Sequence, residues 1–118
     1  MSAEFEARLV RGEGGVAEFE ARAPAGLAYF DGHFEGAPVL PAVAQLEALV
    51  LPLCRAAWGD LGAPRRWLRL KFRRPIGPGS ALTVRLTRAA SGAVVEFAIA
   101  CAGETASTGA ADFGGAAP

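Results

Sequence analysis

The chain of 118 residues is long enough to bury one hydrophobic core and too short for two domains of ordinary size. Its content of 52% apolar and 20% charged residues excludes an intrinsically disordered protein. Twelve basic and twelve acidic residues leave no net charge that would attract nucleic acid or an anionic membrane. We therefore expect one domain over residues 1–118, with a disordered tail of small residues at 114–118.

The N-terminal residues alternate in charge and lack an apolar signal core. The longest apolar stretch, Val39–Trp58, is interrupted by two prolines and three polar residues, so it is not predicted to span a membrane. Cys54 and Cys101 are far apart in apolar surroundings, which is typical of two buried thiols in a reducing cytosol. No Cys/His cluster has zinc-ligand spacing, so we expect no metal site. Because neither a signal core nor a membrane span is predicted, we expect a cytoplasmic protein.

The first elements are two strands joined by a hairpin turn. Apolar and charged residues alternate between Glu4 and Leu9, which predicts a half-buried strand. Gly12–Gly15 is a turn signal, and Val16–Ala23 is the second predicted strand.

A helix follows that is apolar almost all round. From Val39 to Leu53 only Gln45 and Glu47 carry polar side chains, which predicts a helix enclosed by a sheet or a partner. Pro41 suits the first turn, and Pro52 is predicted to kink or end the helix.

The remaining chain alternates like strands between turns. The predicted strands are Trp67–Arg74, Leu82–Thr87, Val94–Cys101 and Thr105–Phe113. Two strands, one helix and four strands predict an α+β fold, in which an antiparallel sheet wraps around one long central helix. Because one small sheet cannot cover this helix, we expect a homodimer to close its open side.

Glu47 is the candidate acid. Helical spacing places it on one face with Val43, Val50, Leu51 and Cys54. Desolvation on such a face would raise the pKa of its carboxyl and suit it to general acid catalysis near neutral pH. The alternative is a structural carboxylate that binds a backbone or protein partner.

His33 is the only histidine and lies between Gly32 and Gly36, on the loop that leads into the helix. An imidazole pKa of about 6.5 allows it to act as a base at neutral pH; the alternative is a loop residue without a role. The N–H groups of Ala42 and Val43 at the helix start suit a thioester carbonyl that develops enolate charge. A meeting of His33 and Glu47 across a two-fold dimer is the simpler geometry.

A basic stretch precedes and occupies the third predicted strand. It comprises Arg65, Arg66, Arg69, Lys71, Arg73 and Arg74. These residues form either a solvated strand face or a docking surface for an acidic partner, such as a carrier protein with its phosphopantetheine arm. RNA is disfavoured, because aromatic side chains do not interleave with the charges on that face.

Two sequence blocks resemble the hotdog-fold 3-hydroxyacyl-acyl carrier protein dehydratases. The first reads His33-Phe-Glu-Gly-Ala-Pro38-Val-Leu-Pro41-Ala-Val43, with Glu47 fourteen positions after the histidine. The second reads Leu70-Lys-Phe-Arg-Arg-Pro75-Ile-Gly-Pro-Gly79-Ser-Ala-Leu82. The short length and the wording around Glu47 are most similar to the small dehydratases of aryl-polyene pathways. Two departures from the family pattern are Glu35 in place of proline and Ala42 in place of glycine.

The resemblance implies a role for each matching position. His33 would remove the C2 proton of a 3-hydroxyacyl thioester, and Glu47 of the opposite subunit would protonate the departing C3 hydroxyl. The N–H of Ala42 or Val43 would polarise the thioester carbonyl. The implied lining of the acyl tunnel is Phe34, Leu40, Leu46 and Val50.

The resemblance also implies partners and alternatives. No cofactor is expected beyond the phosphopantetheine that carries the substrate on acyl carrier protein. The chain is expected to form a homodimer, a higher homo-oligomer or a heterodimer with a related hotdog subunit. A hotdog acyl thioesterase and a non-catalytic acyl-binding subunit remain the alternative functions.

Overall fold

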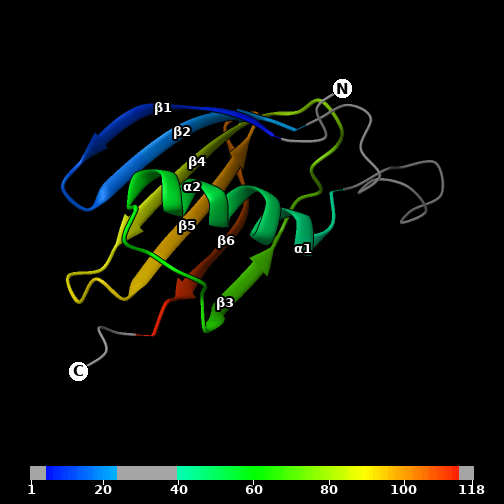
Figure 1. Cartoon of the computed structure of the whole chain (residues 1–118). Helices are drawn as coiled ribbons and strands as arrows, with labels where there is room; N and C mark the ends of the chain where they lie inside the picture. Colours follow the sequence, from blue (N-terminus) through cyan, green and yellow to red (C-terminus); the bar gives the residue numbers. More distant parts are fainter. Residues whose placement is uncertain (1–4, 24–39, 115–118) are drawn as a thin grey trace.

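The structure is a computed structural model that describes residues 5–23 and 40–114. In this part of the chain six strands form one antiparallel sheet, in the order β1-β2-β4-β5-β6-β3 (Figure 1). Their bounds are β1 Glu6–Glu13, β2 Val16–Arg22, β3 Arg66–Phe72, β4 Ala81–Arg88, β5 Val94–Cys101 and β6 Glu104–Asp112. The predicted sheet is confirmed, and β1 and β3 are its edges.

One helical segment crosses a single face of this sheet (Figure 1). It consists of α1 (Ala42–Ala44), the π-helix η2 (Gln45–Val50) and α2 (Leu51–Ala57), which follow one another without a break. The helix-facing residues of the central strands are buried: Ala17, Phe19, Ala21, Leu82, Val84, Leu86, Val95, Phe97 and Ile99. The α+β hotdog arrangement is therefore confirmed, with the sheet covering one side of the helix. No helix in the described ranges is long and apolar enough to cross a membrane.

The burial pattern of the helix repeats every four residues. Leu46, Val50 and Cys54 are buried, whereas Val43 and Glu47 are exposed. At 3.6 residues per turn a four-residue repeat drifts around an α-helix by about 40° per turn. The π-helix corrects this drift, because its longer i→i+5 hydrogen bonds place more residues in each turn.

Pro52 does not end the helix, which excludes one of the two predicted outcomes. The N–H of Leu51 donates to the carbonyl of Leu46, five residues back, so the chain reaches Pro52 from a wide turn. Regular α geometry then restarts with Pro52 in the first turn of α2, where a proline needs no N–H partner. The helix continues to Ala57.

The alternation in the first strand predicted that it is half-buried, but the structure shows it exposed. All eight residues of β1 are exposed, with Leu9 at 55% and Val10 at 49%. β1 pairs only with β2, and its register shifts between Leu9 and Arg11. An edge strand beyond the reach of the helix has no layer to cover its apolar residues.

Strand β3 contains a bulge that changes which side chains face the helix. The register with β6 shifts between Leu68 and Lys71, and Arg69 has a φ of 51°. A Cβ on Gly109 would lie 2.6 Å from Leu70, so only a glycine at this position lets Leu70 pack across β6. Leu70 therefore reaches the helix side of the sheet.

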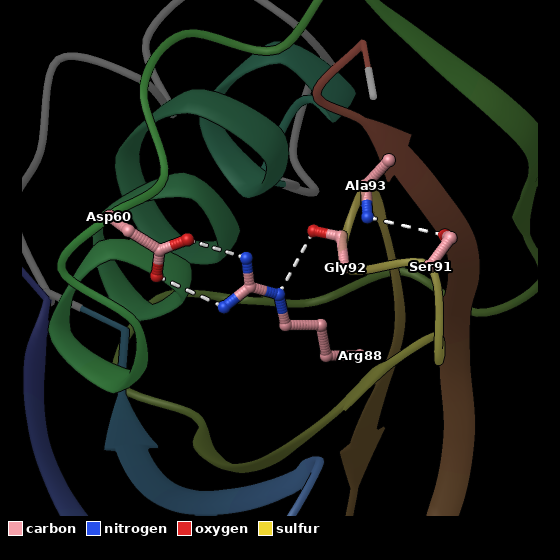
Figure 2. Close-up of polar contacts among 5 residues, drawn as sticks. All are labelled: Asp60, Arg88, Ser91, Gly92 and Ala93. Atoms are coloured by element: carbon pink, nitrogen blue, oxygen red, sulfur yellow. Dashed lines mark hydrogen bonds and ion pairs between the residues drawn. The ribbon is translucent and has the colours of Figure 1, made fainter. Parts of the chain in front are cut away.

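An ion pair fixes the loop that leaves the helix (Figure 2). Arg88 donates to both carboxylate oxygens of Asp60, at 3.0 and 2.6 Å, and to the carbonyl of Gly92 at 3.0 Å. Its guanidinium also lies 5.8 Å from the centre of the Trp58 ring. These contacts tie the end of β4 and the β4–β5 turn to the loop after α2.

We predict that Asp60→Asn lowers the thermal stability at pH 7 by a few degrees. The hydrogen bonds from Arg88 lower the pKa of the Asp60 carboxyl below its ordinary 3.8. A lowered folded-state pKa contributes stability above the unfolded pKa, and this contribution is lost as the pH falls through the folded pKa. Thermal unfolding of wild type and Asp60→Asn should therefore differ at pH 7, and the difference should shrink as the pH falls below the ordinary carboxyl pKa and through the lowered pKa of Asp60. An undiminished difference in acid would contradict this account.

Candidate active site

The start of the helix presents two backbone donors that find no acceptor in the described part of the chain. Pro41 is the N-cap residue, and its carbonyl accepts the N–H groups of Ala44 and Gln45 at 3.1 Å each. The N–H groups of Ala42 and Val43 have no acceptor among the described residues, and both residues are exposed. This start can donate hydrogen bonds to a carbonyl that develops negative charge.

Glu47 projects from the exposed side of the helix. It makes no hydrogen bond or ion pair with any described residue, so no structural partner of its carboxylate is seen within those ranges. Val43, one turn earlier, shares this side and is 58% exposed. The predicted common face with Val50 and Cys54 is wrong, because the π-helix places those two residues in the core.

The desolvation predicted for Glu47 is therefore not provided by the described part of its own chain. A second chain laid over the side that carries Val43 and Glu47 would provide it.

The remaining predicted site residues fall into two groups. His33, Phe34 and Glu35 lie outside the described residues, so the predictions for them stay predictions. Leu40, Leu46 and Val50 are at most 7% exposed and belong to the core of the single chain. Their role in lining an acyl tunnel also stays a prediction.

The six predicted docking residues differ in their surroundings: some are in ion pairs and others line a groove. Arg66 is paired with Asp112 at 2.9 Å, and Arg74 with Glu104 at 2.6 Å. Arg69, Lys71 and Arg73 instead line a groove on the sheet face that points away from the helix. Arg65 precedes β3 and lies next to Gly114.

Both cysteines are free, and only one is fully buried. Cys54 lies in the core, where burial raises the pKa of its thiol to about 12. Cys101 is only partly buried, because it is the last residue of β5. The prediction of two buried thiols is thus confirmed for Cys54 alone, whose thiol is held in the unreactive neutral form.

Sequence reasoning overlooked a buried polar pair beneath the helix start. Ser107 on β6 donates a hydrogen bond of 2.5 Å to the side-chain oxygen of Gln45. Gln45 is one of only two polar residues between Val39 and Leu53, and this was the signal that the sequence offered. Nothing in the sequence indicates that Ser107 is its partner, because 62 positions separate them.

Comparison with known proteins identifies a dehydratase family and a dehydratase relative. Residues 10–110 match the family described as ApeI-like, ApeI dehydratase. A curated relative, the 3-hydroxyacyl-acyl-carrier-protein dehydratase FabZ of Gluconobacter oxydans, is 36% identical over 75 residues. That match covers 57% of this chain and 44% of the relative, so the chain spans less than half the length of FabZ.

Two solved structures have a similar fold. The dehydratase heterocomplex ApeI:P from Xenorhabdus doucetiae matches with a TM-score of 0.75 and 23% identity, over 91% of this chain and 96% of that one. An uncharacterized protein from Erwinia carotovora subsp. atroseptica matches with a TM-score of 0.69 and 25% identity, over 95% of each chain.

Proposed function

Because the chain belongs to the ApeI-like dehydratase family, we propose that it dehydrates a 3-hydroxyacyl thioester on acyl carrier protein to the trans-2-enoyl thioester, in fatty acid or aryl-polyene type biosynthesis. The observation that carries the proposal is the position of Glu47. This carboxylate is exposed and without a partner among the described residues, on the helix whose start offers the free N–H groups of Ala42 and Val43.

The reaction needs a base, an acid and a donor to the carbonyl. His33 removes the proton from C2 while the N–H of Ala42 or Val43 stabilises the enolate oxygen. Glu47 of the opposite subunit donates its proton to the C3 hydroxyl. The C3–O bond breaks, water leaves and C2=C3 forms, after which His33 loses the C2 proton and Glu47 regains one.

Ala42 is compatible with this role although it replaces the family's glycine. The donor is the backbone N–H, which alanine retains. The Ala42 side chain is exposed, so its methyl group adds bulk where the thioester approaches. We expect it to narrow the range of acyl groups near the reacting carbons.

We propose that a second copy of the chain covers the exposed side of the helix. Edge strand β3 has backbone groups without a strand partner among the described residues, and it exposes Leu70 at 37% and Phe72 at 42%. Phe72 pairs directly with Ser107, which contacts Gln45 in the helix, so Phe72 faces the helix side of the sheet. A homodimer that pairs at β3 would cover these side chains together with Val43 and Glu47.

The test is incubation of the purified protein with a 3-hydroxyacyl carrier protein. Loss of one water and the appearance of a conjugated enoyl thioester, followed by mass spectrometry, support the proposal. Release of free thiol would identify a thioesterase instead. Binding without turnover, with activity restored only by a related hotdog subunit, would identify a non-catalytic partner subunit. Ala42 is the residue that favours this second candidate.

We further propose that the carrier protein docks at the groove on the outer face of the sheet. Arg69, Lys71, Arg73 and Arg85 line it, and Glu96 is the only acid among its lining residues in the described ranges. Carrier proteins with acidic surfaces would be attracted by this charge. We also propose that the enzyme needs no cofactor of its own and that it works in the cytoplasm.

Charge reversal should separate docking from chemistry. We predict that Lys71→Glu/Arg73→Glu raises KM for the carrier-bound substrate by about tenfold or more at low salt, with kcat nearly unchanged. Kinetics with a free pantetheine thioester should not change. Arg8→Glu/Arg11→Glu on β1 carries the same charge change and is the matched control. Equal effects of both pairs would place docking elsewhere.

A further inference from the structure

We propose that Gln45 and Ser107 are a positioning pair that sets the rotation of the helix about its axis and thereby points Glu47 out of the sheet. This inference rests on the proposed function only for its kinetic consequence. The pair itself is visible in the described residues.

Gln45 and Ser107 are the only buried polar side chains in the described ranges, with exposures of 3% and 0%. Ser107 donates to the Gln45 side-chain oxygen at 2.5 Å, and the Gln45 amide nitrogen donates to the carbonyl of Leu40 at 3.1 Å. Both ends of the amide are thus used, one on β6 and one on the residue before the N-cap.

The pair is not explained by core filling. Its neighbours in the core include Leu49, Val50 and Ile99, and apolar side chains would fill the same space without burying polar atoms. A buried amide that must hydrogen-bond to a hydroxyl on another element allows only one rotation of the helix about its axis. Aliphatic side chains can pack at several rotations.

The second observation is where this pair lies along the helix. Gln45 is the first residue of η2, and Glu47 is two residues later in the same π-helix. Two residues correspond to about 200° of rotation in an α-helix and to somewhat less in the wider turns of a π-helix, so both geometries place them on roughly opposite sides. Holding Gln45 against β6 therefore turns Glu47 to the opposite side, where it is exposed.

The π-helix also needs such support. A π turn is rare, and a regular α-helix is its competitor. Relaxation of η2 to α geometry would shift Glu47 relative to Val43 and the helix start. The hydrogen bonds from Ser107 to Gln45 and from Gln45 to Leu40 hold the first turn, while the Leu40 N–H donates to Ile76 O at 2.7 Å.

The experiment compares Ser107→Ala and Gln45→Leu with Val95→Ala. Val95 is fully buried on β5 and lies opposite Ala111, four positions along β6 from Ser107, so Val95→Ala controls for lost stability. We expect the first two variants to lower kcat by about 10–100-fold with KM changed less than about twofold, because small misplacements of a catalytic group have such effects. Ser107→Thr, which keeps the hydroxyl, should recover most of the loss.

An activity-independent measurement accompanies the kinetics. Amide hydrogen exchange at Leu51, whose N–H bonds to Leu46, should quicken at least about tenfold in Ser107→Ala and Gln45→Leu. Exchange at Trp58, whose N–H bonds to Cys54 at 2.8 Å, should not change. Val95→Ala should leave the ratio of the two rates as in wild type.

The two measurements test the positioning role of the pair and the proposed function separately. Unchanged exchange at Leu51, or changed exchange with unchanged kcat, overturns the positioning role and leaves the dehydratase proposal standing. A wild-type protein that dehydrates nothing refutes the proposed function, and quickened exchange at Leu51 then still supports the pair as the device that sets the helix.

Discussion

Glu47→Gln is expected to lower kcat for dehydration by about 10²–10⁴-fold, the usual contribution of a general acid. The glutamine has nearly the same shape, but it cannot give a proton to the leaving hydroxyl. Because Glu47 is exposed and has no partner among the described residues, the melting temperature should not fall. Stopped assays of enoyl product, with thermal unfolding of the same preparation, measure both quantities.

Glu13→Gln provides the matched control for this variant. Glu13 is also exposed, and it is the last residue of β1, at the opposite edge of the sheet from β3. Its replacement removes the same charge without touching the acid, so kcat should remain near the wild-type value. If Glu47→Gln turned over as fast as Glu13→Gln, Glu47 would not be the acid. His33→Ala should show a loss as large as that of Glu47→Gln, since the base is removed instead.

The sheet was predictable because its signals are local. Alternation in β4 and β5 continues without interruption, and the turns between strands contain glycines with positive φ, such as Gly14 and Gly103. The predicted strand Val94–Cys101 matches β5 at both ends. Period-two burial and turn chemistry require no knowledge of the partner strand.

The missed features depend on contacts between distant residues. The bulge in β3 is accommodated by the missing side chain of Gly109, 40 positions away from Arg69. The exposure of β1 depends on how far the helix extends over the sheet. The alternation of residues in β1 and β3 indicates neither the exposure of β1 nor the bulge in β3. Both strands were therefore predicted to bury every second residue.

The sequence singled out the candidate site residues but did not indicate the geometry of the helix that carries Glu47. The apolar surroundings of Glu47 in the sequence drew attention to it, but α-helical spacing assigned it the wrong neighbours. The π-helix, which reverses the burial of Val50 and Cys54 relative to Glu47, is held by Gln45 and its contact with Ser107. A one-dimensional period cannot reveal a change of period that a tertiary contact causes.

Mixed dimers of His33→Ala and Glu47→Gln chains should regain activity that neither homodimer has. If each site takes His33 from one subunit and Glu47 from the other, a mixed dimer has one site with both defects and one intact site. Equal amounts mixed at random give half mixed dimers, so activity should reach about one quarter of the wild-type value per subunit.

The mixing experiment distinguishes a shared site from a site within one chain. If His33 and Glu47 of the same chain formed the site, every site in a mixed dimer would carry one defect, and mixing would restore nothing. Differently tagged chains, purified through both tags, enrich the mixed dimer and should double the specific activity to about one half of wild type. Because Glu47 is exposed in the single chain beside the exposed Val43, a subunit interface over this side is the arrangement that desolvates the acid, and recovery on mixing is the result that this arrangement requires.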